Sequence, residues 1–435
     1  MNIPFTEHTL ANGLTVLLHE DHACPIVAVN IWYHVGSKNE RPGHTGFAHL
    51  FEHLMFEGSE HYDRGYFRPL QGAGGTLNGS TNADRTNYWE VVPAGALELA
   101  LWMESDRMGY LLPALTGPKF ANQRDVVLNE RRQNYENRPY GLAPMAMLAA
   151  LFPPDHPYHW STIGEIADLR AVTLADVQAF FRTYYHPANA SLAIAGDIDP
   201  EAALGLARAC FEDLPAGPAV GRVSPPPAPL DAESRLLLED RVELPRLYLA
   251  WLTPAMFADG DADLDLAADL LANGKTSRLY RRLVFEERIA TDVSAAQNSR
   301  EVAGFVQVAA TAAPGHTLAE IDAIVAEEIA RLGGEGPTGD ELARGQVQAE
   351  AQFMFRLQTV GGFGGKSDQL NAYQIFLGDP GFFERDLARY RAVTAESLRA
   401  IVDRCLGHRR RVALSVVPLG RADLALPDST RAAVS

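Results

Sequence analysis

The stretch Gly46-Phe-Ala-His-Leu-Phe-Glu-His-Leu-Met-Phe-Glu-Gly58 carries the strongest structural signal in this chain. Its apolar residues follow the i, i+3, i+4, i+7 spacing that places side chains on one buried face of a helix: Phe47, Leu50, Phe51, Leu54 and Met55. We therefore predict a helix that begins near Phe47, with Gly58 as its C′ residue.

The same stretch contains the pattern H-x-x-E-H at His49-Leu-Phe-Glu-His53. Two histidines four residues apart on a helix lie on one face, where both imidazoles can hold one Zn²⁺ at about 2.0–2.1 Å. Glu52 lies beside the second histidine, within reach of a proton on a water molecule at the metal. The motif alone also fits two core histidines whose ring nitrogens are hydrogen bonded.

Length and charge restrict the class of protein. The 435 residues exceed the usual size of one hydrophobic core, so two or more domains are expected. A formal net charge of −17 argues against nucleic acid or an anionic membrane surface as the main partner. The composition, 47% hydrophobic and 21% charged, is that of a globular protein.

No apolar run reaches the length of a membrane span. Residues 1–13 lack the basic and apolar regions of a signal peptide, so we expect a cytoplasmic protein. A periplasmic chain from which a signal peptide had been removed would look the same. Cys24, Cys210 and Cys405 form no C-x-x-C pair and are expected to be buried free thiols.

A proline-rich stretch divides the chain. Pro215-Ala-Gly-Pro218 and Ser224-Pro-Pro-Pro-Ala-Pro229 are typical of an extended linker between domains. We predict a zinc-bearing catalytic domain over 1–214, a linker over 215–234 and a second domain over 235–435.

The two halves look like repeats. Arg170-Ala-Val-Thr173 recurs as Arg391-Ala-Val-Thr394, and a threonine suits the N-cap of the helix that each copy opens. These helices are predicted over 174–184 and 395–406, each followed by a strand, over 190–195 and 411–417. Coincidence would explain a four-residue match, but its equivalent place in two equal halves favours duplication.

The beginnings of the halves also correspond. A predicted strand over 25–33 precedes the histidine helix, and one over 245–252 precedes a helix around 264–272. Aligning the two copies places Asp265, Ala268 and Asp269 opposite His49, Glu52 and His53. The second half therefore lacks this chemistry, and we expect one catalytic half and one degenerate half.

A catalytic zinc commonly has three protein ligands and one water, so a third ligand must come from elsewhere. Acidic residues in the segment 122–138 are the candidates. Spacing within this segment does not choose between Glu130 and Glu136.

An ordered set of motifs, spread over nearly the whole chain, resembles the pitrilysin/insulinase metallopeptidases, and most closely their bacterial branch similar to mitochondrial processing peptidase. The stretches that carry the resemblance are Asn12–Val16, Val35–Ser37, Gly46–Gly58, Gly75–Thr81, Tyr88–Pro93, Glu104–Met108, Val126–Glu130, His156–Tyr158 and Thr359–Lys366.

The resemblance implies an α+β fold: two homologous α/β-sandwich-like halves, joined by the linker, that close like a clamshell around a chamber. It also implies one Zn²⁺ per chain, held by His49, His53 and Glu130, with Glu52 as general base. Glu130 matches the family's third ligand in its distance from His53 and in its Val-Val-Leu-Asn-Glu context.

The segment 86–92 alternates β-forming residues and is predicted to be a strand. In the family this is an edge strand that pairs with the extended substrate. Asn78, Gly79 and Ser80 lie just before it and are expected to face the peptide. Phe51 either lines a pocket for a substrate side chain or belongs to the core.

Two departures from the family pattern matter. Gln123 stands where the family has a glutamate that supports the ligands, which predicts weaker zinc retention. Val284 and Thr291 stand where complete members have an arginine and a tyrosine that anchor the substrate. The resemblance therefore implies a heterodimer with a homologous subunit that carries this pair, unless Arg281, Arg282 or Arg288 shifts the alignment.

The leading hypothesis is a zinc endopeptidase that acts on peptides or unfolded polypeptides. Two alternatives stay open. One is a non-catalytic structural or scaffolding homologue, against which the complete set of site residues argues. The other is a maturation protease for one dedicated precursor peptide, which residues alone do not distinguish from a general peptidase.

Overall fold

The computed structural model describes residues 2–226, 228, 230–407 and 410–434. The chain forms two compact units, each assembled from three segments. The first unit contains residues 1–129, 161–223 and 352–385, and the second contains 130–160, 224–351 and 386–435.

The first unit is built on a six-stranded mixed sheet, ordered β1-β2-β6-β3-β5-β4. Strand β2 pairs with β6 in parallel, and the other neighbouring strands are antiparallel. Its strands are β1 (Thr6–Thr9), β2 (Thr15–Glu20), β3 (Ile26–Tyr33), β4 (Thr76–Thr81), β5 (Thr86–Pro93) and β6 (Ala190–Gly196).

The second unit contains a sheet of closely similar topology, ordered β12-β7-β11-β8-β10-β9. Strand β7 is parallel to β11, as β2 is to β6, and β8 is antiparallel to β11, as β3 is to β6. This match supports the expected duplication. The strands are β7 (Ser234–Asp240), β8 (Arg246–Thr253), β9 (Ala290–Asn298), β10 (Gly304–Ala312), β11 (Val412–Pro418) and β12 (Thr430–Arg431).

Helices flank both sheets, so the α+β class expected from the sequence is confirmed. They are α1 (Phe47–Leu54), α2 (Phe67–Gly72), α3 (Leu97–Ala114), α4 (Gly117–Arg131), α5 (Ala143–Leu151), α6 (Ile166–Ala171), α7 (Leu174–Tyr184), α8 (Pro200–Phe211), α9 (Asp261–Ala272), α10 (Leu318–Glu335), α11 (Gly339–Arg356), α12 (Lys366–Leu377), α13 (Phe383–Ala392) and α14 (Ala395–Cys405).

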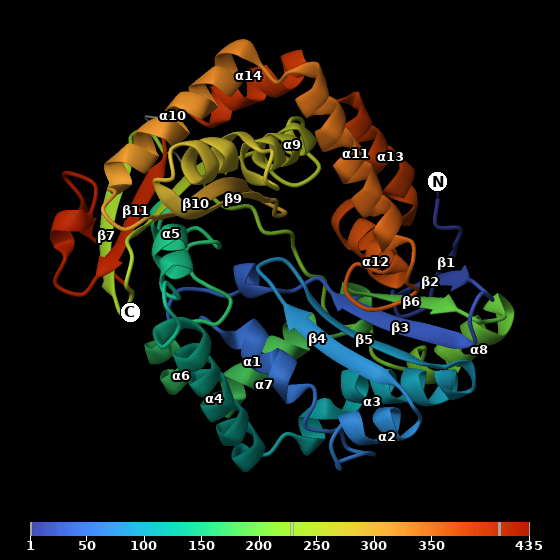
Figure 1. Cartoon of the computed structure of the whole chain (residues 1–435). Helices are drawn as coiled ribbons and strands as arrows, with labels where there is room; N and C mark the ends of the chain where they lie inside the picture. Colours follow the sequence, from blue (N-terminus) through green and yellow to red (C-terminus); the bar gives the residue numbers. More distant parts are fainter. Residues whose placement is uncertain (1, 227, 229, 408–409, 435) are drawn as a thin grey trace. The chain divides into compact units, whose positions relative to one another are not determined.

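Each sheet is covered on both faces. In the first unit α12 packs on β3 and β6, and α3 and α8 lie against the opposite face (Figure 1). In the second unit α9, α10 and α14 cover one face, and α5 packs on β8 and β11 from the other side (Figure 1). The central strands β3 and β6 are almost completely buried, because they have helices above and below them.

The predicted repeat helices are confirmed, and both begin at their threonine. The Thr173 hydroxyl accepts a hydrogen bond from the Asp176 N–H, and the Asp176 carboxylate accepts one from the Thr173 N–H. Thr394 and Ser397 form the same reciprocal cap on α14. Aspartate and serine therefore complete a capping box here without the usual Glu or Gln.

The compact units do not follow the expected domain limits. Helix α12 comes from the second half of the sequence but belongs to the first unit, and α5 from the first half belongs to the second unit. The described residues between 215 and 233 form no helix or strand, and residues 227 and 229 of the expected linker lie outside the described residues. The domain limits 1–214, 215–234 and 235–435 stay a prediction about the duplicated halves.

All three cysteines are free thiols, as expected, but none is fully buried. Cys210 and Cys405 are half-buried, and Cys24 is exposed because it lies in the turn before β3. Among the described helices, none has both the length and the apolar character needed to cross a bilayer.

Candidate metal centre

Helix α1 carries the histidine motif. Phe47, Leu50 and Leu54 are buried on its inner face, as the spacing predicts. The helix ends at Leu54, so Gly58 is not its C′ residue. Gly58 instead takes a left-handed backbone with φ +115° after a short further turn. On the remaining surface His49, Glu52 and His53 are each half-buried.

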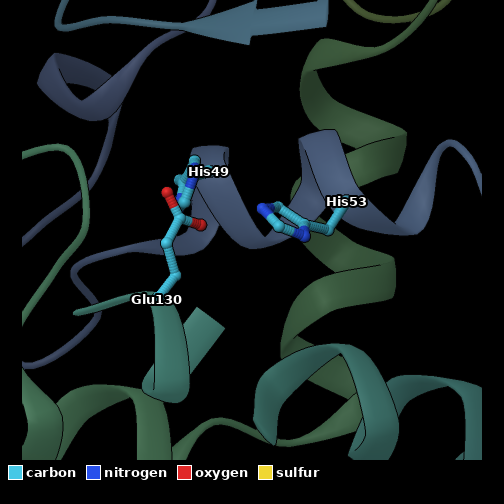
Figure 2. Close-up of side chains that lie close together, drawn as sticks. All are labelled: His49, His53 and Glu130. Atoms are coloured by element: carbon cyan, nitrogen blue, oxygen red, sulfur yellow. The ribbon is translucent and has the colours of Figure 1, made fainter. Parts of the chain in front are cut away.

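Helix α4 brings the third candidate ligand to the motif. Glu130 lies on the last turn of α4. This helix begins in the first unit, whose first segment ends at Asn129. His49, His53 and Glu130 each offer one ligand atom, and these atoms lie within 4.8 Å of one another. Figure 2 shows the Glu130 carboxylate reaching toward the two imidazole rings from the end of α4.

This donor set fits a zinc ion. Two imidazoles and one carboxylate are the protein ligands of many catalytic zinc sites, which leave a fourth position for water. Zinc holds its ligand atoms about 2.0–2.2 Å away, and hence about 3.3 Å apart in a tetrahedron. Small side-chain rotations would therefore bring the three ligand atoms from their observed separations to those of a zinc site. Within the described residues, this is the only such group of histidine, cysteine or acidic side chains found.

An arginine and two buried tyrosines lie close enough to Glu52 to interact with its charge. Its negative charge interacts with Arg85, Tyr88 and Tyr185. Burial raises the pKa of the Tyr88 hydroxyl well above its usual range, and the charge of Glu52 adds to this effect. The phenols therefore stay neutral, and Arg85 provides positive charge near Glu52.

Sequence reasoning missed Arg85. Its Nη1 donates to the Ser80 carbonyl and hydroxyl oxygens at 2.8 and 2.6 Å, and its guanidinium lies 4.9 Å from the ring centroid of Trp32. Burial lowers the pKa of Arg85, an effect that Asp368 and Glu52 oppose. No local pattern distinguishes this arginine from one in a surface turn, because its role depends on contacts with distant residues.

The expected substrate-facing residues lie on β4, which contacts α1. Asn78 is exposed, Gly79 is buried and Ser80 is half-buried, and the Ser80 hydroxyl donates to Asn87 at 2.7 Å. The strand at the edge of the sheet is β4, whereas β5 is paired on both sides. The expectation that the 86–92 strand forms the edge is therefore wrong, because 76–81 forms an additional strand outside it.

Of the two roles left open for Phe51, the structure supports the core role. Its side chain is 1% exposed. The ring lies against Phe181 and Tyr185, at centroid distances of 5.1 and 4.6 Å. A side chain that is enclosed by aromatic rings does not line a substrate pocket, so Phe51 instead fixes α1 against α7.

Gln123 lies seven residues before Glu130 on α4. Its amide donates a hydrogen bond to the carboxylate of Glu57, just beyond the end of α1. Glu57 is four residues after His53, so this bond joins the helix that carries Glu130 to the segment that follows the histidines.

In the second unit, the residues aligned with the motif form a different arrangement. Asp265 accepts a 2.5 Å hydrogen bond from the hydroxyl of Tyr390. Burial raises the pKa of Asp265 to about 7 and also raises that of Asp269. Helix α9 carries no histidine, so it offers carboxyl groups without imidazoles.

Val284 and Thr291 stand where the substrate-anchoring arginine and tyrosine were expected, and neither can take over that role. Val284 is half-buried and packs against the core of the second unit, and Thr291 is exposed on β9. Nearby, Arg282 pairs with Glu287, Glu327 and Glu328, which commits its guanidinium. The neighbouring Arg281 pairs with Glu286, and Arg288 has a left-handed backbone with φ +57°.

Comparison with known families gives the chain its classification. A sequence profile described as "Insulinase (Peptidase family M16)" matches residues 15–156, and one described as "Peptidase M16 inactive domain" matches 171–348. The chain belongs to peptidase family M16. The histidine motif and Glu130 fall within the first match. Helix α9 of this M16 chain, which carries no histidine, falls within the second.

Named relatives of this M16 chain include zinc proteases. The zinc protease PqqE of Helicobacter pylori is 32% identical over 65% of this chain and 64% of its own length, so the match spans less than two thirds of that protein. A probable mitochondrial-processing peptidase subunit beta of Arabidopsis thaliana is 25% identical over 56% of this chain and 46% of that protein. A solved protease structure from Helicobacter pylori shares the fold, with a TM-score of 0.87 and 24% identity over 96% of this chain and all of that one.

Proposed function

We propose that this chain is a zinc-dependent endopeptidase that hydrolyses peptides or unfolded polypeptides. The observation that carries the proposal is the convergence of His49, His53 and Glu130, with their ligand atoms within 4.8 Å of one another. Surface carboxylates and core histidines do not need to converge in this way. Relatives named as zinc proteases favour the same chemistry.

Each residue has a role in this proposal. His49, His53 and Glu130 would hold the metal, which when bound supplies a Lewis acid that activates water and polarises the scissile carbonyl. Glu52 lies one residue from His53 and three from His49, so its carboxylate can accept the proton of the attacking water and pass it to the leaving amine. Arg85 keeps positive charge beside Glu52.

The free edge of β4 suits an extended peptide. An edge strand presents unpaired N–H and C=O groups, to which a substrate can hydrogen bond as an added strand. Because α1 contacts β4, a peptide paired along this edge would run close to the ligand residues. Asn78, Gly79 and Ser80 would face it, and backbone pairing makes an extended, unfolded chain the suitable substrate.

We further propose that the chain acts with a homologous partner subunit. Val284 and Thr291 replace the arginine and tyrosine expected to anchor the substrate, and Arg281 and Arg282 are held in ion pairs. A relative named as a subunit of a processing peptidase is consistent with division of the site between chains.

The test is cleavage of a mixed peptide library by the purified, zinc-loaded chain, compared with Glu52→Gln. We expect the variant to bind one zinc per chain but to lose at least about 100-fold in kcat, because removal of a general base has that effect. Cleavage that persists in Glu52→Gln would refute Glu52 as the base. Wild-type protein that binds no zinc would refute the metal centre itself.

A further inference from the structure

The first turn of α1 lacks a cap of its own. The N-cap residue is Gly46, in a left-handed backbone with φ +86°, and it has no side chain to accept a hydrogen bond. A Cβ added there would lie 2.8 Å from the Ile163 carbonyl oxygen and 2.9 Å from a methyl group of Leu169. The tight packing that requires glycine therefore excludes the Ser, Thr, Asp or Asn that usually caps a helix.

Glu40, six residues before this glycine, supplies the missing acceptor. Its Oε2 accepts the Gly46 N–H at 2.9 Å and its Oε1 accepts the Ala48 N–H at 2.8 Å. The first N–H groups of a helix have no partner within the helix, so one side chain here satisfies two of them.

Glu40 is half-buried, and no described cation pairs with its carboxyl group. Among the described residues, the hydrogen bonds of the Glu40 side chain are those to the start of α1, and no ion pair to it is found. Burying a carboxyl group without a cation is costly, so the N–H groups of α1 are what stabilise it there.

The cap lies directly beside the metal ligands. Ala48, whose N–H it holds, immediately precedes His49, and the whole helix has only eight residues. An isolated helix of this length is not stable by itself in water, so its position depends on the contacts at its ends and on its buried face. A change in the first turn would therefore shift the His49 imidazole relative to His53 and Glu130.

We propose that Glu40 is a positioning residue for the metal centre. Its carboxyl group fixes the first turn of α1 and thereby the separation of the three ligand atoms. The inference rests on the proposed zinc site and extends it to a residue that touches neither metal nor substrate.

Glu40→Gln is the main test, because it keeps the size of the side chain but replaces one acceptor oxygen with an NH₂ group. That group would face a helix N–H that needs an acceptor. We expect zinc affinity, measured by competition with a chromophoric chelator, to fall about 10-fold or more, the range seen for residues that support metal ligands. Thr394→Ala, which removes the cap of α14 in the second unit, is the matched control and should leave zinc affinity unchanged.

A second readout separates positioning from general stability. Saturating zinc should raise the Tm of wild type and Thr394→Ala by the same amount, and that of Glu40→Gln by less. Should Glu40→Gln fail to fold, Glu40→Asp, which keeps the charge but shortens the reach, should show a reduced zinc-induced rise. Zinc affinity within 2-fold of wild type in either folded Glu40 variant would overturn the inference. Wild-type protein that binds no zinc would instead refute the proposed function.

Discussion

At the scale of single residues, Gln123 is the position where resemblance and structure lead to different expectations. The family pattern suggests that the missing charge weakens zinc retention and that a glutamate would restore it. In the structure the Gln123 amide donates a hydrogen bond to the Glu57 carboxylate. An ionised glutamate at position 123 has no proton to donate and would lose this bond. This bond joins α4, which carries Glu130, to the segment after α1.

We predict that Gln123→Glu weakens zinc binding by up to about 10-fold at neutral pH, because two carboxylates would face each other where one hydrogen bond now holds the helices. Chelator competition measures the affinity. The double variant Gln123→Glu, Glu57→Gln should recover it, since the donor and acceptor are exchanged. Tighter zinc binding by the single variant would favour the family pattern over the contact seen here.

At the scale of secondary-structure elements, a cluster of buried charged side chains joins α3 to strand β5 of the first sheet. Arg107 of α3 lies between the rings of Tyr66 and Tyr88, with its guanidinium 4.0 and 4.1 Å from their centroids. It pairs with Glu104 on the same helix and lies 3.7 Å from Glu90 of β5. Burial raises the pKa of Glu90 well above its usual range, and the charge of Glu104 adds to this.

We predict that Arg107→Leu destabilises the fold by about 3–5 kcal/mol, because it leaves two buried carboxyl groups without their cation. Urea unfolding followed by circular dichroism measures the change. Arg421→Leu, which breaks an exposed ion pair with Asp423, is the control and should leave the midpoint unchanged. A loss below about 1 kcal/mol for Arg107→Leu would show that the cluster does not hold α3 to β5.

At the scale of the whole molecule, two sheets of closely matching topology differ in the chemistry beside them. The helix next to the first sheet carries two histidines and Glu52, and α9 in the second unit carries aspartates instead. Asp265 there is bonded to Tyr390. A duplication would explain the shared backbone, because the buried strands need only apolar side chains and polar positions are free to differ.

We predict that the chain purified from its native source is found in a complex with a second M16 chain that has Arg and Tyr at the positions of Val284 and Thr291. Size-exclusion chromatography with mass spectrometry identifies the complex. Adding the partner to the isolated chain should raise kcat/KM by at least about 10-fold, because it supplies anchoring contacts to the substrate. An isolated chain that is fully active as a homodimer would contradict this.

Local patterns were sufficient for much of the fold. The spacing of apolar residues located α1, and the threonines located the first residues of α7 and α14. Such features depend on neighbours within four residues, so a single sequence contains them. The spacing of His49 and His53 also sets their common helix face. Choosing Glu130 over Glu136 needed the family resemblance.

Other features depend on contacts between residues far apart in the chain, and only the tertiary structure decided them. Sheet order made β4 the edge strand, and aromatic packing placed Phe51 in the core. The contact of Arg85 with Ser80 and the cap that Glu40 provides for α1 follow no periodic pattern. Sequence alone determined which helices and donor groups this protein has. Folding determined which of them meet, because hydrogen bonding and packing act across space rather than along the chain.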